Sequence, residues 1–123
     1  MPDDELETLV ERWLRLPEVA DLLQIDVRRV RPLLRDRQLV AVRRASRSGG
    51  SAEPYVPELL LLDGHTLPEL PGTVTLLADA GFTDEDTLRW LFTPDPSLPG
   101  SPIEALRSGR KTEIRRRAQA LAF

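Results

Sequence analysis

Eight arginines are concentrated in one short stretch of the chain, residues 26–47, where only two acidic residues accompany them. An arginine side chain carries a planar guanidinium with several N–H donors, so it can form paired hydrogen bonds with a phosphate or with the O6 and N7 atoms of guanine. The chemistry that this stretch could perform is therefore the binding of a polyanion, above all of nucleic acid. The eight residues are Arg28, Arg29, Arg31, Arg35, Arg37, Arg43, Arg44 and Arg47.

The charge is unevenly distributed along the chain. The formal net charge of −3 would by itself disfavour a polyanionic partner, but the local potential decides attraction. Basic residues outnumber acidic ones by six within residues 26–47 and by five within residues 107–123, whereas residues 1–25 and 48–106 are acidic. Sixteen of the seventeen basic residues are arginine and eleven residues are proline, a bias that a GC-rich genome would produce equally well.

A helix-turn-helix is the element that would present these arginines. The sequence predicts a short helix over residues 17–23, a tight turn at residues 24–26, and a second helix over residues 26–37. Helical spacing divides the second helix into an inner apolar face and an outer basic face. The inner face consists of Val27, Val30, Leu33 and Leu34. The centre of the outer face consists of Arg28, Pro32 and Arg35, with Arg29 and Arg31 on its flanks.

The positions of the arginines suggest separate roles. Residues near the start of a recognition helix reach base edges in the major groove, so Arg28, Arg29 and Arg31 are the candidate base readers. A β-hairpin is expected next, with strands at residues 39–43 and 53–57, and its tip would serve as a wing along the DNA backbone or in the minor groove. The candidate phosphate contacts are Arg35, Arg37, Arg43, Arg44 and Arg47.

Two residues depart from the usual helix-turn-helix pattern. Gln24 stands where the turn often has glycine, and a left-handed backbone costs a residue with a Cβ about 1 kcal/mol. Pro32 lies inside the predicted second helix, where a proline removes a backbone hydrogen bond at a cost of about 3 kcal/mol. Because Pro32 belongs to the outer face, we expect a bend that leaves the core packing intact.

The flanking segments are predicted to be mostly helical. Apolar residues at helical spacing predict an amphipathic helix over residues 5–14. Further helices are expected at residues 72–80 and 83–92, and a last helical region follows a proline-rich break and runs from residue 102 through Gly109 to residue 123.

Together these elements define a mainly α fold, a winged helix-turn-helix with a small two-stranded β-hairpin wing and a helical C-terminal extension. At 123 residues the chain is long enough for one compact core but too short for two large independent domains. We expect an N-terminal helix within residues 1–15, the winged helix-turn-helix at residues 16–66, and a helical C-terminal region at residues 67–123 that packs on the same core.

Other kinds of chemistry find little support in the residue types. The chain has no cysteine, so it can form neither a disulfide nor a thiolate metal site. His65 is the single histidine and stands in a turn-like segment, which favours a surface position over a catalytic triad. Asp84, Glu85 and Asp86 suit the first turn of a helix better than a metal site. We expect no catalysis, no bound metal and no cofactor.

The expected location follows from what the sequence lacks. The first residues are acidic where a secretory signal would be basic. No apolar run approaches the roughly 20 residues that span a bilayer. We therefore expect a cytoplasmic protein, associated with the nucleoid, with no membrane partner.

Four segments carry a resemblance to a known family. They are residues 39–44, residues 70–72, the string Arg-Trp-Leu-Phe-Thr-Pro-Asp-Pro-Ser-Leu at residues 89–98, and residues 115–123. These segments resemble the small actinobacterial winged helix-turn-helix DNA-binding proteins that in mycobacteria are substrates of serine/threonine kinase L. The resemblance covers residues from about 16 to 123, and it implies DNA binding without catalysis and a serine/threonine protein kinase as a further partner.

The sequence therefore predicts a regulator of transcription or of the nucleoid that binds double-stranded DNA with residues 26–37 and the wing at residues 43–52. The alternative is an antitoxin-like or adaptor module, because the segment from Pro102 to Gly109 is also similar to the partner-binding half of antitoxins. In that alternative the arginine face is an incidental solvated surface. One recognition helix contacts few base pairs, so either a homodimer or weak, largely non-specific binding is expected.

Overall fold

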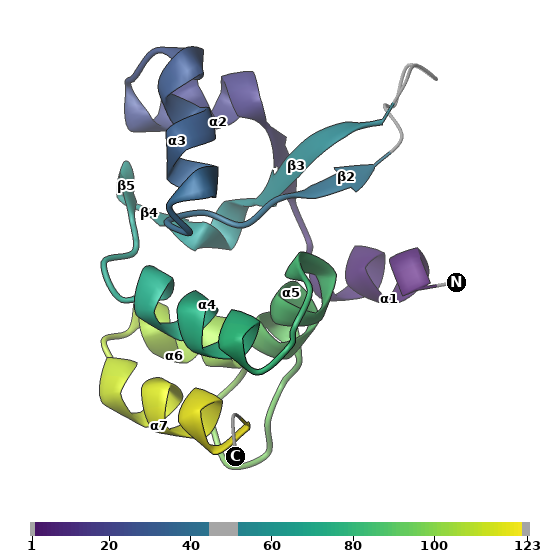
Figure 1. Ribbon diagram of the computed structural model, residues 1–123, viewed down its shortest axis with the longest axis vertical. Coiled ribbons are helices and arrows are strands. Elements are labelled where there is room, and N and C mark those ends of the chain that lie inside the picture. The colour runs from purple at the N-terminus through teal and green to yellow at the C-terminus, as the bar shows by residue number, and fades with distance from the viewer. Residues whose placement is uncertain (1, 45–51, 122–123) are drawn as a thin grey trace.

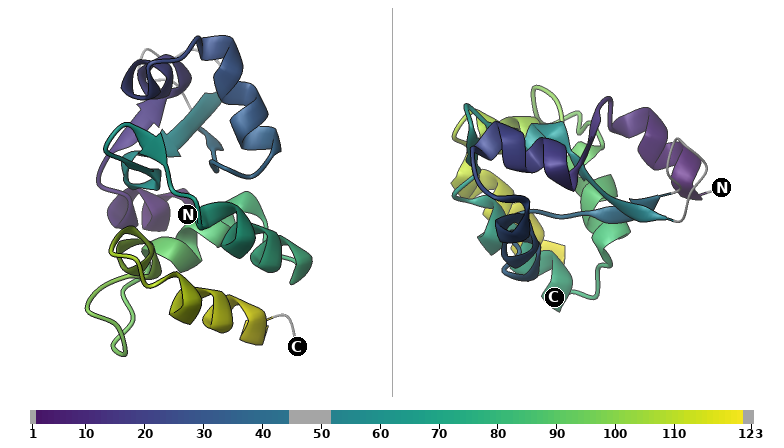
Figure 2. Two further views of the ribbon diagram at one scale, coloured as in Figure 1. Left: turned by 90° about the vertical axis from the view of Figure 1, so that its left-hand side faces the viewer. Right: turned by 90° about the horizontal axis from the view of Figure 1, so that it is seen from above.

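The computed structural model describes residues 2–44 and 52–121, which form two layers (Figure 1). The upper layer in that view contains the helix-turn-helix and two small sheets, and the lower layer contains α4 to α7, with α1 (Pro2–Leu9) beside α5, as the side view in Figure 2 also shows. The tip of the predicted wing, including Arg47, lies outside the described residues. The lower helices are α4 (Leu70–Asp79), α5 (Asp84–Phe92), α6 (Pro102–Arg107) and α7 (Lys111–Leu121).

The first helix and the turn of the predicted helix-turn-helix are confirmed. Helix α2 (Leu16–Leu23) ends at Gln24, which adopts the left-handed conformation with φ 57° and ψ 47°. The backbone N–H of Ile25 donates to the Ala20 carbonyl at 3.0 Å, and that of Gln24 donates to the Asp21 carbonyl at 3.2 Å. This pair of bonds is a Schellman motif, which satisfies the last carbonyls of the helix and turns the chain sharply.

The second helix of the motif is shorter than predicted. A 3₁₀ turn, η1 (Val27–Arg29), leads into α3 (Val30–Arg35), so the prediction of one continuous helix over residues 26–37 is wrong. Pro32 is the third residue of α3, where a backbone N–H has no partner within the helix, and it therefore removes no hydrogen bond. Val30 is fully buried, but Val27 is 43% exposed and does not belong to the inner face, because the tighter 3₁₀ geometry changes its angular position.

The N-terminal segment forms a helix followed by a strand. Helix α1 (Pro2–Leu9) ends before Val10, and β1 (Trp13–Arg15) pairs antiparallel with β3 (Glu53–Pro57). The prediction of a helix over residues 5–14 is therefore wrong at its C-terminal end. Leu14 is buried opposite Val56 in this ladder, so the end of the segment is packed by a strand about 40 residues away and does not continue the helix.

The wing consists of β2 (Val42–Arg44) and β3, and β1 adds a third strand that the sequence did not predict. Strand β3 is central, but β1 pairs with its residues 55–57 and β2 with its residues 53–55. Tyr55 is therefore the single residue of β3 that has a paired strand on both sides. This offset explains how Pro54 and Pro57, which cannot donate to a ladder, are accommodated in a central strand.

The chain crosses from the upper to the lower layer through the 3₁₀ turn η2 (Glu58–Leu60) and the small hairpin β4 (Leu61–Leu62) and β5 (His65–Thr66). The predicted helices at residues 72–80 and 83–92 are confirmed as α4 and α5. The last helical region is two helices rather than one, since Gly109, with φ 90°, ends α6 in the left-handed conformation.

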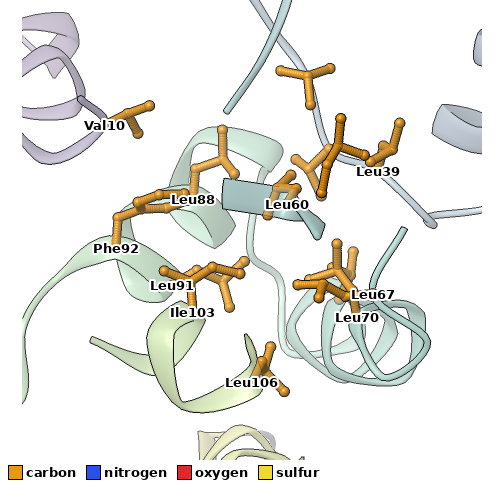
Figure 3. Close-up of a cluster of buried hydrophobic side chains, with 14 of the residues drawn as sticks. Val10, Leu39, Leu60, Leu67, Leu70, Leu88, Leu91, Phe92, Ile103 and Leu106 are labelled. Carbon is orange, nitrogen blue, oxygen red and sulfur yellow. The ribbon is translucent and has the colours of Figure 1, made fainter. Parts of the chain in front are cut away.

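One continuous apolar core joins the two layers. Figure 3 shows Val10, Leu39 and Leu60 from the N-terminal half beside Leu88 and Leu91 of α5, and all five side chains are buried. A polar contact also crosses between the layers. The guanidinium of Arg107 on α6 donates to the backbone carbonyls of Leu59 and Leu61.

Replacing Gln24 by glycine should stabilise the protein. The helices α4 and α6 end in the same turn with glycine, Gly81 and Gly109, in the left-handed position. Gln24→Gly removes a strain of about 1 kcal/mol and should raise the melting temperature by a few degrees in calorimetry. The matched control is Gln119→Gly within α7, which should lower stability by a similar amount. Equal destabilisation by both changes would contradict the role given to Gln24.

The shared core predicts that the two layers unfold together. Leu88→Ala in α5 removes a fully buried side chain and should cost about 2–5 kcal/mol of unfolding free energy. The loss should appear in one denaturation transition, with amide hydrogen exchange accelerated equally in β3 and in α6. Two transitions, with β3 unaffected by the substitution, would show instead that the layers are independent.

Candidate nucleic-acid interface

The recognition segment, defined here as η1 and α3, presents its arginines to solvent. Arg28, Arg29, Arg31 and Arg35 are all exposed, while Val30 between them is fully buried and anchors the segment in the core. Within the described part of the chain, the side chains of Arg29, Arg31 and Arg35 have no hydrogen-bond or ion-pair partner. These three guanidinium groups are therefore available to a ligand without the loss of an internal contact.

Arg28 forms a local pair with Asp26 at the start of the segment. The Oδ1 atom of Asp26 accepts from the Arg28 backbone N–H at 2.8 Å, which caps η1, and from the Arg28 Nε at 3.1 Å. The Arg28 side chain is 88% exposed, and an ion pair in such a position contributes little because water competes for both partners. Arg28 can therefore exchange Asp26 for a phosphate or a base edge at small cost.

Arg37 is exposed at the end of the recognition segment. Its backbone is left-handed, with φ 62°, and the bond from Gln38 N–H to the Leu33 carbonyl closes a Schellman motif like the one at Gln24. The Arg37 side chain has no hydrogen-bond or ion-pair partner among the described residues. Arg37 lies beyond the end of α3, a position consistent with the predicted contact to a DNA phosphate.

The predicted wing arginines occupy two different environments. Arg43 is exposed and donates from Nη2 to the Ala52 carbonyl at 3.0 Å across the hairpin. Arg44 is only 17% exposed in its side chain, pairs with Glu7 of α1, and lies over the Trp13 ring at 4.7 Å from the ring centroid. Arg44 therefore binds within the molecule and stabilises the contact between α1 and the wing.

Arg15 on β1 lies beside the recognition segment and was missed in the sequence, where residues 1–15 were interpreted as a helix. Its Nε donates to Glu53 Oε1 at 2.6 Å, and this bond raises the pKa of the guanidinium. Its backbone N–H donates to Glu18 Oε1 at 2.8 Å. The available signal was its position immediately before Leu16-Pro17, the start of the first helix of the motif.

Other charged clusters are engaged in internal contacts. On α7, Arg117 pairs with Asp95 at 3.1 Å and with Glu113 at 3.2 Å, so Arg115, Arg116 and Arg117 do not form one free patch. Asp86 accepts from the Thr83 backbone N–H at 3.1 Å in a capping box, and the bonds from Thr83 lower the pKa of the Asp86 carboxyl. His65 is exposed on β5.

The geometry defines a class of protein. A helix-turn-helix with a buried anchor and exposed arginines on its second helix, flanked by a β-hairpin, is the arrangement of winged helix-turn-helix DNA-binding proteins. In the ranges that the structure describes, no helix is long and apolar enough to cross a membrane.

Comparison with known proteins identifies the family. The family described as "DNA-binding protein Rv2175c, wHTH domain" matches residues 2–61, and the family described as "Rv2175c C-terminal domain of unknown function" matches residues 67–122. The chain therefore belongs to the Rv2175c family of winged helix-turn-helix DNA-binding proteins, which is not a family of enzymes. The family resemblance inferred from the sequence is confirmed, and the kinase partner that it implied stays a prediction.

One curated relative and one solved structure show the extent of the similarity. The chain is 43% identical over 120 residues to the DNA-binding protein Rv2175c of Mycobacterium tuberculosis, covering 88% of this chain and 79% of that protein. The solution NMR structure of Rv2175c matches with a TM-score of 0.79 at 38% identity, covering 91% of this chain and 82% of that chain. The predicted mainly α winged fold is confirmed by this match.

Removal of the Arg28 side chain should change the titration of Asp26. The Arg28 side chain is the largest cause of the lowered pKa of Asp26, so Arg28→Ala should raise that pKa, although the Arg28 backbone N–H still donates. A carboxyl with a lowered folded-state pKa stabilises the fold above its unfolded pKa, and that contribution is lost as pH falls through the folded value. Arg28→Ala should therefore weaken the acid dependence of stability below about pH 4.

The measurement is a carbon-detected NMR titration of the aspartate carboxyls, with denaturation at several pH values beside it. Asp86 is the internal control, because its pKa is lowered chiefly by bonds from Thr83, far from the substitution in sequence. An unchanged Asp26 titration would show that the pair with Arg28 does not persist in solution.

Proposed function

We propose that this protein binds double-stranded DNA as a transcriptional or nucleoid-associated regulator, with the recognition segment in the major groove and the β2–β3 wing along the backbone. The observation that carries the proposal is the exposure of Arg29, Arg31 and Arg35 on a segment that the buried Val30 holds in place. Exposed guanidinium groups along a recognition segment with a buried backbone anchor suit both guanine edges and phosphates.

Arg28, Arg29 and Arg31 are proposed as base readers, because they lie in the first turns of the recognition segment. Arg35, Arg37 and Arg43 are proposed as phosphate contacts, because they lie toward its end and on the wing. Arg47 remains a proposed phosphate contact on sequence grounds alone. Arg44 is left out of the proposed set, since its pair with Glu7 and its position over Trp13 would have to break first.

The distribution of charge favours one orientation on DNA. Residues 26–47 carry eight arginines and two acidic residues, whereas α5 begins with three acidic residues, Asp84, Glu85 and Asp86. Phosphates attract the recognition segment and repel the start of α5, so we expect the protein to approach DNA with the recognition segment first.

Two further partners are proposed with this function. A homodimer would extend the few base pairs that one recognition segment can contact to two half-sites. A serine/threonine protein kinase is proposed from the family resemblance, and mass spectrometry of the chain after incubation with such a kinase tests it. A nucleoid location in the cytoplasm follows from the proposed DNA binding.

An adaptor function for the C-terminal helices is the second candidate. An open groove of about 560 Å³ runs along α5, and its lining includes Phe82, Trp90, Pro94 and Pro102, which could hold an apolar segment of a protein partner. Under this alternative a protein copurifies with the chain, and substitutions in the recognition segment leave its function unchanged.

Arg31→Ala and Arg35→Ala should each weaken DNA binding by about 1–3 kcal/mol, and the affinity of the unmodified chain should fall steeply with salt. Gel shifts with random and genomic duplexes at two salt concentrations, run beside a sizing measurement, give affinity, specificity and oligomeric state. The matched control is Arg116→Ala, which removes an exposed arginine from α7 in the lower layer. Equal effects of all three substitutions, or no binding at all, would contradict the proposal.

A further inference from the structure

A hollow of about 350 Å³ lies where the start of α2, the recognition segment and the wing meet. Three arginines line it from two separate elements, Arg15 from β1 and Arg28 and Arg31 from the recognition segment. These arginines come together only because β1 pairs with β3 and brings Arg15 opposite Tyr55. We call this cavity the arginine hollow.

The arginine hollow has more hydrogen-bond donors than the molecule itself uses. Arg15 binds Glu53 through Nε only, which leaves both of its Nη groups without a partner among the described residues. Arg28 uses Nε and Nη2 for Asp26, which leaves Nη1. Arg31 has no partner in the described ranges. The unused donors belong to charged groups, so they favour an anion with several acceptor oxygens.

Arg15 is held in position before any ligand arrives. Its side chain is fixed by Glu53 at 2.6 Å, its backbone by Glu18 at 2.8 Å, and its strand by the ladder with β3. The side chain is nevertheless 56% exposed. A guanidinium that is fixed through Nε and open at both Nη atoms loses little conformational entropy when it binds a phosphate. Glu53 therefore acts as a positioning residue.

Apart from Glu53 the rest of the lining is apolar, and this apolar surface distinguishes between the candidate ligands. Leu16, Pro17, Val27 and Pro54 contribute carbon surface next to the three guanidinium groups. A free inorganic anion gains nothing from such a surface. A phosphodiester is different, because the carbon atoms of its sugar can pack against the apolar residues while its oxygens accept from the arginines.

We propose that the arginine hollow binds one phosphodiester of the DNA backbone together with its adjoining sugar. The proposal rests on the proposed function and adds Arg15 as a backbone contact from outside the helix-turn-helix. Glu53 in the lining and Asp26 beside it each bind part of one guanidinium, so the donors left for phosphate among the described residues are both Nη groups of Arg15, Nη1 of Arg28 and the whole guanidinium of Arg31. Binding there fixes the position of the recognition segment relative to the backbone. In this arrangement Arg28 and Arg31 contact phosphate, which leaves Arg29 as the base reader of the segment.

The matched pair Arg15→Ala and Arg12→Ala tests the proposal. Arg12 also precedes α2, also pairs with a glutamate, Glu58 at 3.3 Å, and is 68% exposed, but it does not line the hollow. Arg15→Ala should lower the affinity for duplex DNA about tenfold and should reduce the slope of log affinity against log salt by about 0.9. Arg12→Ala should leave both quantities close to those of the unmodified chain.

Folding of each variant is checked by its melting temperature, and Arg15→Lys serves if Arg15→Ala does not fold. Lysine keeps the charge but lacks the fork that binds two oxygens, so it should restore the salt slope and only part of the affinity. If Arg15→Ala and Arg12→Ala have equal effects while Arg35→Ala still weakens binding, the hollow is not a backbone site and the proposed function stands. If the unmodified chain binds no DNA, both proposals fall.

A second experiment separates a phosphodiester from a free anion. The unmodified full chain is titrated with the thymidine dinucleotide, which has one phosphodiester, and separately with inorganic phosphate at matched ionic strength, while NMR follows the Nε–Hε signals of Arg15 and Arg28. The dinucleotide should shift both signals at several-fold lower concentration. Equal or stronger shifts with inorganic phosphate would overturn the role of the sugar, and an unaffected Arg15 signal in both titrations would overturn the site.

Discussion

The burial of Val30 determines which way the arginines of the recognition segment face. Val30 is the first residue of α3 and has no exposed surface, so its side chain fixes the rotation of the helix against the core. Successive residues of a helix differ by about 100° in direction, and the residues on either side of a buried anchor are therefore turned toward solvent. The left-handed turn at Gln24 sets the angle at which this segment leaves α2, and the burial of Val30 depends on that angle.

The C-terminal helices support this arrangement from below. A single cluster of buried side chains runs from Val10 and Leu39 through Leu60 to α5 and α6, with no boundary between the layers (Figure 3). Arg107 adds hydrogen bonds to the carbonyls of Leu59 and Leu61 at the crossing between the layers. The helices of residues 67–122, a region described in the family as of unknown function, thus have a physical role in holding the winged helix-turn-helix.

Carboxylates of the molecule bind some of its arginines, while other arginines stay exposed to solvent. Glu7 holds Arg44 against Trp13, so this arginine stabilises the junction of α1 and the wing. Glu53 and Asp26 each engage part of one guanidinium and leave other donors open. Arg29, Arg31 and Arg35 keep all of their donors, as far as the described residues show. A net charge of −3 is therefore compatible with a strongly basic surface, because acidic residues outside the recognition segment account for it.

The sequence by itself determined what local patterns control: the helix-turn-helix with its unusual Gln24 turn, the strand at residues 53–57, the capped helix after Thr83, and the concentration of arginines. It could not determine what depends on segments far apart in the chain. The formation of strand β1, the burial of Arg44 and the position of Arg15 arise from contacts with residues more than 30 positions away, such as the 38-residue separation of Arg15 and Glu53. Tertiary structure decided these, because the pairing free energy comes from partners that no local window of sequence contains.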